Sequence, residues 1–446
     1  MKEKDLSLKT LILMGGALFS MHFGASSMIW PVTWGRESGS SIFAAYIGIF
    51  LTALFIPFLG YLALSRGKGT FLQITSRISP KFASLFCGFT IFVMGIFLIP
   101  RMSAAAWDAI VQLTGYQASS AVPIIAFSIV FYLITYWFTA SRSKTVDRIG
   151  TILFPVLIVI VLGVIGKGVL MPISTWQPKT YETSAPIYGF LQGFATGELP
   201  CALIFGVIIL NDLKNKGVKP ENFNKCLIKV GIAGIGILSL THLGHMLVGS
   251  LNGALFPGIM YSALYTQVVV ELWGRIGGTC FSIALMFAVL TTAIGLAAAC
   301  AEYFEEATEG KLSYKKGVTA TLILSTVVSS FGLNTVMTYV GPLIDVTYPA
   351  AIVMTLYYAF APNCIDNKRG INAMRYGVVI SFLWGVFDVI IIYIDTLELN
   401  ADILKNIYHM LPFSEVRLSW VPLAVICMVI GYFTCSPDKM EAAKAS

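Results

Sequence analysis

Hydrophobic residues occur in long blocks along this chain, and charged residues gather in short segments between them. Most blocks extend over about 20 residues, which as an α-helix cross the roughly 30 Å hydrocarbon core of a bilayer. The pattern therefore predicts an all-α, polytopic membrane protein with about twelve transmembrane helices. The expected spans are residues 10–30, 41–64, 82–111, 119–140, 149–170, 186–210, 226–250, 274–301, 317–331, 335–359, 372–394 and 418–435.

The composition supports this prediction and argues against a soluble enzyme. Hydrophobic residues make up 57% of the 446 residues, charged residues make up only 12%, and the mean hydropathy is +0.79. A soluble chain of this length needs a larger charged fraction to cover its surface. The expected spans leave only short loops, and the sequence contains no P-loop, HExxH or GxSxG motif. Neither ATP-driven transport nor hydrolytic catalysis is therefore predicted.

Basic residues are distributed unevenly over the expected loops. With a cytoplasmic N-terminus, 23 of the 30 Lys and Arg residues lie in inner loops, six lie in outer loops, and Arg101 lies within a span. Positive charge concentrates on the cytoplasmic side of membrane proteins, so both termini are predicted to be cytoplasmic and the protein to reside in the cytoplasmic membrane. Helix orientation thus accounts for the net charge of +7, and membrane lipid rather than nucleic acid is the expected surrounding partner.

Eight cysteines are scattered through the chain without a CxxC motif. Cysteines in this pattern usually pack as small hydrophobic residues. We therefore expect neither a disulfide framework nor a transition-metal site, and the sequence indicates no obligate protein partner.

Two expected spans contain small and helix-breaking residues at their centres. The span 10–30 contains the segment GASS at 24–27, and the span 186–210 contains two glycines, a glutamate and a proline between residues 193 and 200. Proline lacks an N–H donor and glycine tolerates non-helical dihedral angles, so both helices are expected to be interrupted. Irregular backbone at mid-membrane depth is stable where it lines a cavity or is buried in protein. The alternative is a pair of small-residue seams for helix packing.

The two interrupted spans are the first and the sixth along the chain. Spans 1–5 and 6–10 then form two halves with an odd number of helices each, which enter the membrane from opposite sides. Such an inverted repeat is typical of secondary transporters with a binding site at the bilayer midplane. We expect the first repeat in residues 1–170, the second in 171–360, and two accessory C-terminal helices in 361–446.

The chemistry of interrupted helices indicates the type of cargo. Half-helix N-termini expose unpaired N–H groups that suit a carboxylate, whereas half-helix C-termini and unwound carbonyls suit a cation. A small zwitterionic amino acid together with a small cation fits both kinds of group.

A third polar element is expected in the span 274–301. Thr291 and Thr292 lie in an otherwise apolar helix, and Ala288 lies one turn before them. Hydroxyl and carbonyl oxygens are hard ligands that suit a small cation such as sodium. The alternative is that each threonine hydroxyl bonds to a carbonyl of its own helix.

Taken together, these residues resemble the branched-chain amino acid:cation symporters, the BrnQ-type carriers of the amino acid–polyamine–cation superfamily. The similarity covers nearly the whole chain. The segments that carry it are MHFGASSMIWP (21–31), GIFLIPRMSA (95–104), GFLQGFATGELPCALIFG (189–206), LTTAIGLAAACAEYF (290–304) and the stretch from Gly332-Leu333 to Tyr348-Pro349.

The resemblance implies a leucine-transporter-type fold with a five-plus-five inverted repeat. It implies a symporter that imports leucine, isoleucine or valine by alternating access, with Na⁺ or H⁺ as the coupling ion and no other cofactor. Methionine, alanine or another neutral amino acid is the alternative cargo. The cation site that the resemblance implies comprises Ser20, Phe23, Ala288, Thr291 and Thr292. The implied substrate-binding residues are Gly24, Ala25, Ser26, Ser27, Ala195, Thr196, Gly197 and Glu198.

The chain also departs from the family pattern at the implied pocket. Ser26 and Ser27 replace the usual glycine–asparagine pair, Glu198 replaces an aspartate, and Gln192 replaces a glutamate. These changes leave open which amino acid and which coupling ion the site takes. Glu198 has three candidate roles: to hold the substrate ammonium, to bind a proton in place of sodium, or to cap the half-helix N-terminus.

Other ionisable residues within spans are costly and therefore candidates for function. Arg101 and Asp108 lie two turns apart on one helix face and are predicted to form an ion pair or a gate. Asp345 is a further gate candidate, and His22 is a candidate pH sensor. His242 and His245 are expected to serve helix packing, and Asp388 is expected to serve packing or a dimer contact.

Overall fold

The computed structural model describes residues 6–116, 120–141 and 144–435. Over these residues the regular structure is entirely helical, as the hydrophobic blocks predict. The α-helices are α1 (Leu8–His22), α2 (Ala25–Ser38), α3 (Ile42–Ile49), α4 (Ile56–Gly67), α5 (Phe71–Ser76), α6 (Pro80–Val93), α7 (Ile99–Thr114), α8 (Val122–Thr139), α9 (Thr145–Arg148), α10 (Phe154–Leu170), α11 (Ala185–Phe194), α12 (Glu198–Asn215), α13 (Phe223–Asn252), α14 (Tyr261–Ala307), α15 (Tyr314–Ser329), α16 (Leu333–Thr335), α17 (Tyr348–Phe360), α18 (Lys368–Thr396), α19 (Asp402–His409) and α20 (Trp420–Thr434).

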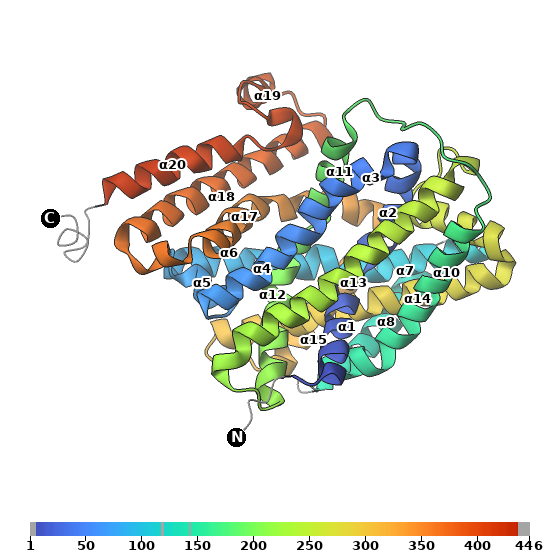
Figure 1. Cartoon of the computed structure of the whole chain (residues 1–446), viewed down its shortest axis with the longest axis horizontal. Helices are drawn as coiled ribbons and strands as arrows, with labels where there is room; N and C mark the ends of the chain where they lie inside the picture. Colours follow the sequence, from blue (N-terminus) through green and yellow to red (C-terminus); the bar gives the residue numbers. More distant parts are fainter. Residues whose placement is uncertain (1–5, 117–119, 142–143, 436–446) are drawn as a thin grey trace. The chain divides into compact units, whose positions relative to one another are not determined.

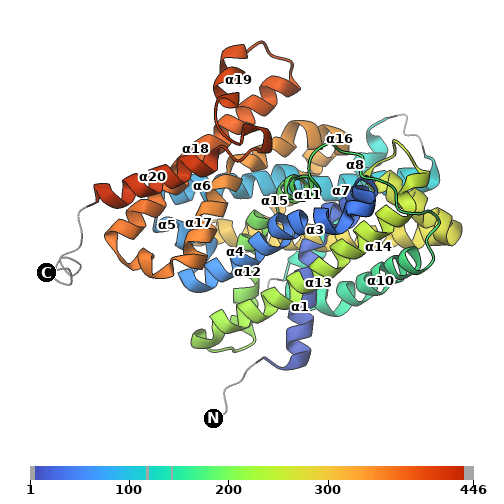
Figure 2. The ribbon, with the colours of Figure 1, turned by 45° about the horizontal axis from the view of Figure 1, so that its top comes forward.

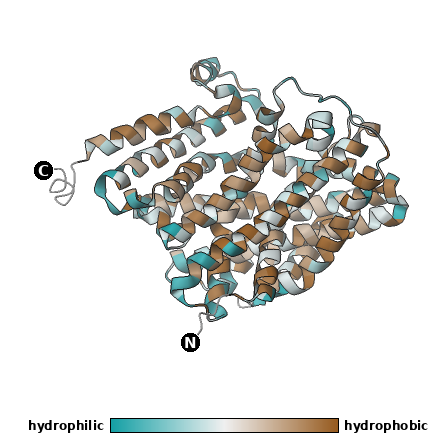
Figure 3. Cartoon of the chain, viewed as in Figure 1, coloured by the Kyte–Doolittle hydropathy of each residue, from teal (hydrophilic) through white to brown (hydrophobic). Residues whose placement is uncertain are grey.

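Most of these helices are apolar along their length, and hydrophilic residues gather at helix ends and in loops (Figure 3). Within the described residues, seven helices are long and apolar enough to cross a membrane, and nine if two bent helix pairs count as one span each. A multi-pass helical membrane protein is therefore confirmed.

The helix count differs from the expected number of about twelve spans. One reason is that a single helical stretch of 43 residues, Ala25–Gly67, contains both the end of the first expected span and all of the second. Another is that α1, α17 and α20 are apolar but shorter than 18 residues. Length and composition alone therefore do not confirm twelve spans.

The helices form two packed units. The first comprises the chain up to Phe58 together with Met94–Met337, and the second comprises Leu59–Val93 and the chain from Thr338 onward. These units cut across the expected segments 1–170, 171–360 and 361–446. Packing groups helices by contact whereas a repeat relates them by symmetry, so the inverted repeat stays a prediction.

The first expected helix break lies in the first unit, between α1 and α2. Helix α1 ends at His22, Phe23 has ψ 66°, and α2 begins after the extended Gly24. Helix α13 runs beside α2 and α1 (Figures 1 and 2). This packing needs glycine, because a Cβ atom at Gly249 of α13 would overlap the carbonyl oxygen of Val32 in α2. Small residues let membrane helices approach closely in this way.

The second expected break separates α11 from α12, also in the first unit. Helix α11 ends at Phe194, α12 begins at Glu198, and the two halves are bent by 48°. Gly197 has φ 72°, a left-handed conformation that favours glycine. Pro200 lies in the first turn of α12, where its missing N–H would have no helical partner. Gly197 therefore makes the break, and Pro200 is compatible with the helix that follows.

Helix α14 carries the paired threonines. It is interrupted at Gly274, which has φ 68° and ψ −169°. The regular part of the helix therefore begins after Gly274, which is also the expected start of the span 274–301. It packs against α1, α2 and α7. Thr291 reaches Ser20 of α1 and Thr292 lies beside Gly24, so the threonine pair faces the first helix break.

In the second unit, α17, α18 and α20 pack together. Asp345 pairs with Arg417, with 3.4 Å between Nη1 and Oδ2. Five of the basic residues used to predict orientation lie outside the described residues: Lys2, Lys4, Arg142, Lys439 and Lys444.

Candidate functional site

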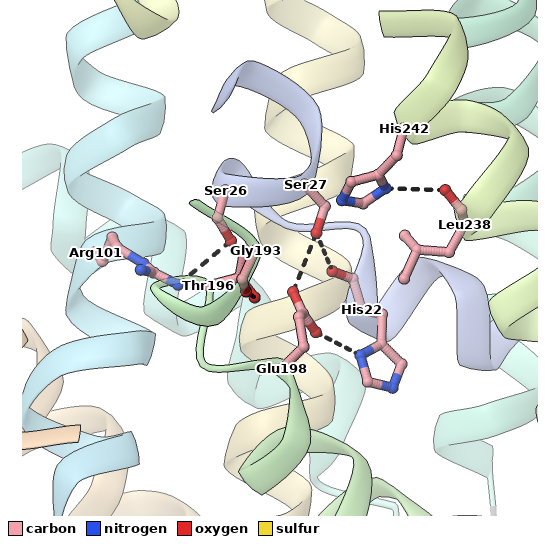
Figure 4. Close-up of polar contacts among 9 residues, drawn as sticks. All are labelled: His22, Ser26, Ser27, Arg101, Gly193, Thr196, Glu198, Leu238 and His242. Carbon is pink, nitrogen blue, oxygen red and sulfur yellow. Dashed lines mark hydrogen bonds and ion pairs between the residues drawn. The ribbon is translucent and has the colours of Figure 1, made fainter. Parts of the chain in front are cut away.

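Polar side chains from both helix breaks meet in the interior of the first unit. His22 comes from the end of α1, Ser26 and Ser27 from the start of α2, and Glu198 from the start of α12 (Figure 4). All four are buried. Each break exposes backbone and side-chain polar groups that would bond differently in a continuous helix. Polar groups of one break form hydrogen bonds with those of the other.

Glu198 links the two breaks directly. Its Oε2 atom lies 2.6 Å from Nδ1 of His22, and its Oε1 atom accepts a hydrogen bond of 3.1 Å from the Ser27 hydroxyl. The Ser27 hydroxyl also lies 3.0 Å from the His22 carbonyl oxygen. Glu198 is the first residue of α12, where a carboxylate also interacts favourably with the helix dipole. The residue before it, Gly197, has no side chain that could cap the helix, and the three candidate roles of Glu198 stay predictions.

A small enclosed cavity of about 10 Å³ lies between the breaks. This is about the space of one water molecule, so the surrounding helices must separate before an amino acid can bind there. The lining residues are Met21, His22, Gly24, Ser26, Leu98, Arg101, Met102, Thr196, Glu198, Cys201, Phe205, Thr292 and Leu296.

The cavity brings together part of the predicted substrate site. Gly24, Ser26, Thr196 and Glu198 line it, and the Thr196 hydroxyl donates to the Gly193 carbonyl at 2.7 Å. The predicted residues that do not line it are Ala25, Ser27, Ala195 and Gly197. Ser27 instead reaches the site through its hydrogen bond to Glu198.

The individual apolar residues that line the cavity were not identified from the sequence, and neither was Arg101 as a lining residue. Met21, Leu98, Met102, Phe205 and Leu296 are apolar residues in apolar helices. Their residue types do not distinguish them from apolar residues that face lipid or pack in the protein core. Proximity to the breaks was the available signal for Met21, and the remaining positions depend on helix packing.

Arg101 and Asp108 do not form the predicted ion pair. Arg101 reaches Ser26 of α2, whereas Asp108 accepts a hydrogen bond from Ser262 of α14. Seven residues advance an α-helix by roughly 10 Å, so the two side chains share a face but lie at different depths. Each therefore finds its partner on a neighbouring helix.

Oxygen atoms from α1 and α14 meet beside the first break. The Thr291 hydroxyl lies 2.6 Å from the Ser20 carbonyl oxygen and 2.8 Å from the Ala288 carbonyl oxygen. Within the described chain, the buried hydroxyls of Thr292 and Ser20 have no hydrogen-bond partner. A Cβ atom at Gly24 would lie 2.8 Å from the Thr292 hydroxyl oxygen. This donor set consists of oxygen atoms with unused lone pairs, which fits a hard cation.

Thr291 thus bonds to a carbonyl of its own helix, as the alternative expects, and also to Ser20 of α1. The cation site stays a prediction. Four of its five residues contribute to this oxygen cluster or adjoin it: Ser20, Ala288, Thr291 and Thr292. Phe23 is buried at the break with non-helical ψ, and no hydrogen bond joins its carbonyl to the cluster.

The other buried histidines contact ordinary helix partners. His242 Nδ1 lies 2.9 Å from the Leu238 carbonyl oxygen of its own helix, and His245 Nδ1 lies 2.8 Å from the Tyr265 hydroxyl. These contacts agree with the packing role expected from their spacing. Asp345 pairs with Arg417 and does not line the cavity.

A multi-pass helical protein whose two interrupted helices enclose buried polar groups has the architecture of a secondary transporter. Its fold is similar to that of solved transporters. One is Mhp1, a nucleobase-cation-symport-1 family transporter, with TM-score 0.56 and 12% identity over 95% of this chain and 92% of that one. Another is a Na⁺-coupled sialic acid symporter, with TM-score 0.59 and 13% identity over 96% of this chain and 90% of that one.

The sequence identifies the family more closely. The chain belongs to the branched-chain amino acid transport protein family, whose sequence model matches residues 7–437. It is 28% identical to the branched-chain amino acid permease BraB of Bacillus subtilis (strain 168), over 96% of each chain. Members of this family are membrane transporters rather than enzymes, in agreement with the absence of catalytic motifs in the sequence.

Proposed function

We propose that this protein imports branched-chain L-amino acids across the cytoplasmic membrane by sodium-coupled symport. Leucine, isoleucine and valine are the proposed cargo, and alternating access around the α1–α2 and α11–α12 breaks is the proposed mechanism. The proposed architecture is twelve spans, with a five-plus-five inverted repeat and two accessory C-terminal helices.

The observation that carries the proposal is the oxygen cluster between α1 and α14. In this cluster the Ser20 and Ala288 carbonyl oxygens each lie within 2.8 Å of the Thr291 hydroxyl oxygen, next to a helix break that also borders the cavity. A sodium ion bound there would hold the end of α1 against α14 and so stabilise one arrangement of the first broken helix. Ion binding would then favour the state that binds substrate, which is the physical basis of symport.

The apolar lining of the cavity supports an aliphatic cargo. Met21, Leu98, Met102, Phe205 and Leu296 surround the polar groups of the breaks. Zwitterionic groups would meet the breaks, and a branched aliphatic side chain would lie among these apolar residues.

Uptake of labelled leucine into proteoliposomes tests this function. We expect an inward sodium gradient to drive accumulation and an imposed inside-negative potential to raise it, because one charge moving through 100 mV corresponds to about 2.3 kcal/mol. Leucine, isoleucine and valine should compete with the label, whereas charged amino acids should not. Leucine uptake that does not respond to a sodium gradient would contradict sodium coupling.

The His22–Glu198 contact favours a second candidate, a proton as the coupling ion. A histidine and a carboxylate 2.6 Å apart form a site that can gain or lose a proton during transport. Glu198 also lies within electrostatic range of three described titratable groups, Arg101, Cys201 and His242. Uptake driven by an inward proton gradient without sodium would support this candidate over the first.

A further inference from the structure

Arg101 is a buried cation that forms no salt bridge within the described residues, although Glu198 lies within electrostatic range of it. The residue is 4% exposed, and within the described chain its Nε atom has no hydrogen-bond partner. Its one hydrogen bond is long, 3.5 Å from Nη2 to the Ser26 hydroxyl. Asp108, which lies on the same helix, bonds to Ser262 instead.

Aromatic contacts offset only part of the free-energy cost of burying the Arg101 charge. The guanidinium carbon lies 4.8 Å from the ring centroid of Phe97 and 5.5 Å from that of Trp30. Such contacts attract a cation, but an aromatic ring does not supply the hydrogen-bond acceptor that Nε lacks. A buried charge whose donors are unused is strongly destabilising unless another group completes its environment.

The guanidinium faces the cavity at the first turn of α2. Arg101 and Ser26 both line the cavity, and Ser26 is the second residue of a 14-residue helix. The backbone N–H groups of a first helical turn have no partner within their own helix and suit an anion. Glu198, on another wall of the same cavity, supplies the opposite charge.

We infer that Arg101 is the residue that binds the substrate's carboxylate, together with the first turn of α2. A guanidinium presents parallel N–H donors that match both oxygens of a carboxylate. The substrate ammonium then faces Glu198. Glu198 and Arg101 together recognise the two charged groups of an α-amino acid. This inference rests on the proposed function, and it assigns to Arg101 a binding role in place of the expected ion pair.

The closed cavity agrees with this role. The space of about 10 Å³ does not hold an amino acid, so binding separates the walls and brings a carboxylate between Arg101 and α2. The long bond to Ser26 is easily given up, because a weak contact costs little to break.

Binding measurements on the purified, full-length protein test the inference. L-leucine is compared with L-leucinamide, which keeps the ammonium and the side chain but lacks the negative charge. Calorimetry in sodium buffer gives the ratio of their dissociation constants for the wild type, Arg101→Gln and Arg101→Lys. Arg148→Gln is the matched control, because Arg148 also lies over an aromatic ring, 4.7 Å from the centroid of Trp137, and does not line the cavity.

We expect the wild type and Arg148→Gln to bind leucine at least about tenfold more tightly than leucinamide. Arg101→Gln should weaken leucine binding by about 10- to 100-fold and leave leucinamide binding within about threefold, so the preference is lost. Arg101→Lys keeps the charge but not the paired donors, and it should retain an intermediate preference.

An unchanged preference in Arg101→Gln overturns the inference, as does a wild type that binds both ligands equally. If Arg101→Gln does not fold, a full wild-type preference in Arg101→Lys overturns it. A wild type that binds no branched-chain amino acid contradicts the proposed function instead. The same comparison is then made with methionine or alanine and its amide, so the role of Arg101 is judged separately from the choice of cargo.

Discussion

At the scale of single residues, the site consists of buried polar groups with partners far away in sequence. Glu198 contacts His22 and Ser27, and Thr291 contacts Ser20. The residue types were predictable, because hydroxyl and carboxyl groups are rare within apolar spans. Their partners were not predictable, because a contact across 176 positions depends on how two helices pack.

The hydroxyl of Thr292 is expected to contribute to cation binding rather than to folding. Thr292→Val removes the oxygen while keeping the shape, and Thr292→Ser keeps the oxygen. We expect Thr292→Val to raise the sodium concentration for half-maximal leucine uptake by about tenfold, because a cation loses one of its few ligands. Sodium titration of uptake in proteoliposomes measures this change.

Thr135→Val provides the control for this experiment. The Thr135 hydroxyl is also buried, but it donates to the Phe131 carbonyl of its own helix. Its removal should leave the sodium dependence unchanged. An equal loss of uptake by Thr292→Val at low and at saturating sodium would count against a role for Thr292 in cation binding.

At the scale of elements, the two interrupted helices were the most predictable feature. Gly197 makes the second break with a positive φ that favours glycine, whereas Gly24 at the first break is extended and leaves room for the Thr292 side chain. Pro200 was less informative, since it falls within the first turn of α12 rather than in the break. The contact of α13 with α2 was not predicted, because a glycine on a helix does not reveal which helix it faces.

Gly249 and Gly236 of α13 provide a test of that contact. A Cβ atom at Gly249 overlaps the backbone of α2, whereas a Cβ atom at Gly236 meets open space. Alanine gains about 1 kcal/mol of helix propensity over glycine at either position. We expect Gly236→Ala to keep or raise the thermal unfolding temperature in detergent and Gly249→Ala to lower it, with a net cost of about 1–3 kcal/mol.

Equal unfolding temperatures for these two variants would mean that α2 and α13 are not held in close contact. A Gly249→Ala variant that folds but transports poorly would still agree with the contact, because α2 carries Ser26 and Ser27 at the site.

At the scale of the whole molecule, hydrophobic patterning identified the class of protein. Blocks of apolar residues are required for any helix that crosses lipid, so an all-helical membrane protein was predictable from composition and spacing alone. The transporter class also needed the two interrupted spans and the family resemblance. The number of spans was less certain, because helices shorter than 18 residues and one 43-residue helical stretch obscure the division between spans.

An even number of spans and the distribution of basic residues predict that both termini lie in the cytoplasm. Reporters fused to the two ends should therefore give the same result: a cytoplasm-dependent fluorescent protein should be bright at both ends, and a periplasm-dependent phosphatase should be inactive at both. A fusion at the end of α10, near Leu170, should report the opposite side. Reporters of opposite activity at the two ends would contradict an even number of spans.

The sequence alone determined the membrane class, the two helix breaks and the types of polar group available near them. These properties are local, since they depend on the hydrophobicity of a segment and on the backbone freedom of single residues. Only the tertiary structure decided which polar groups meet. Arg101 shares a helix face with Asp108 yet faces the cavity beside Ser26, and Asp345 pairs with Arg417, 72 positions away. Such pairings arise when helices pack side by side, which brings groups at the same depth together whatever their separation along the chain.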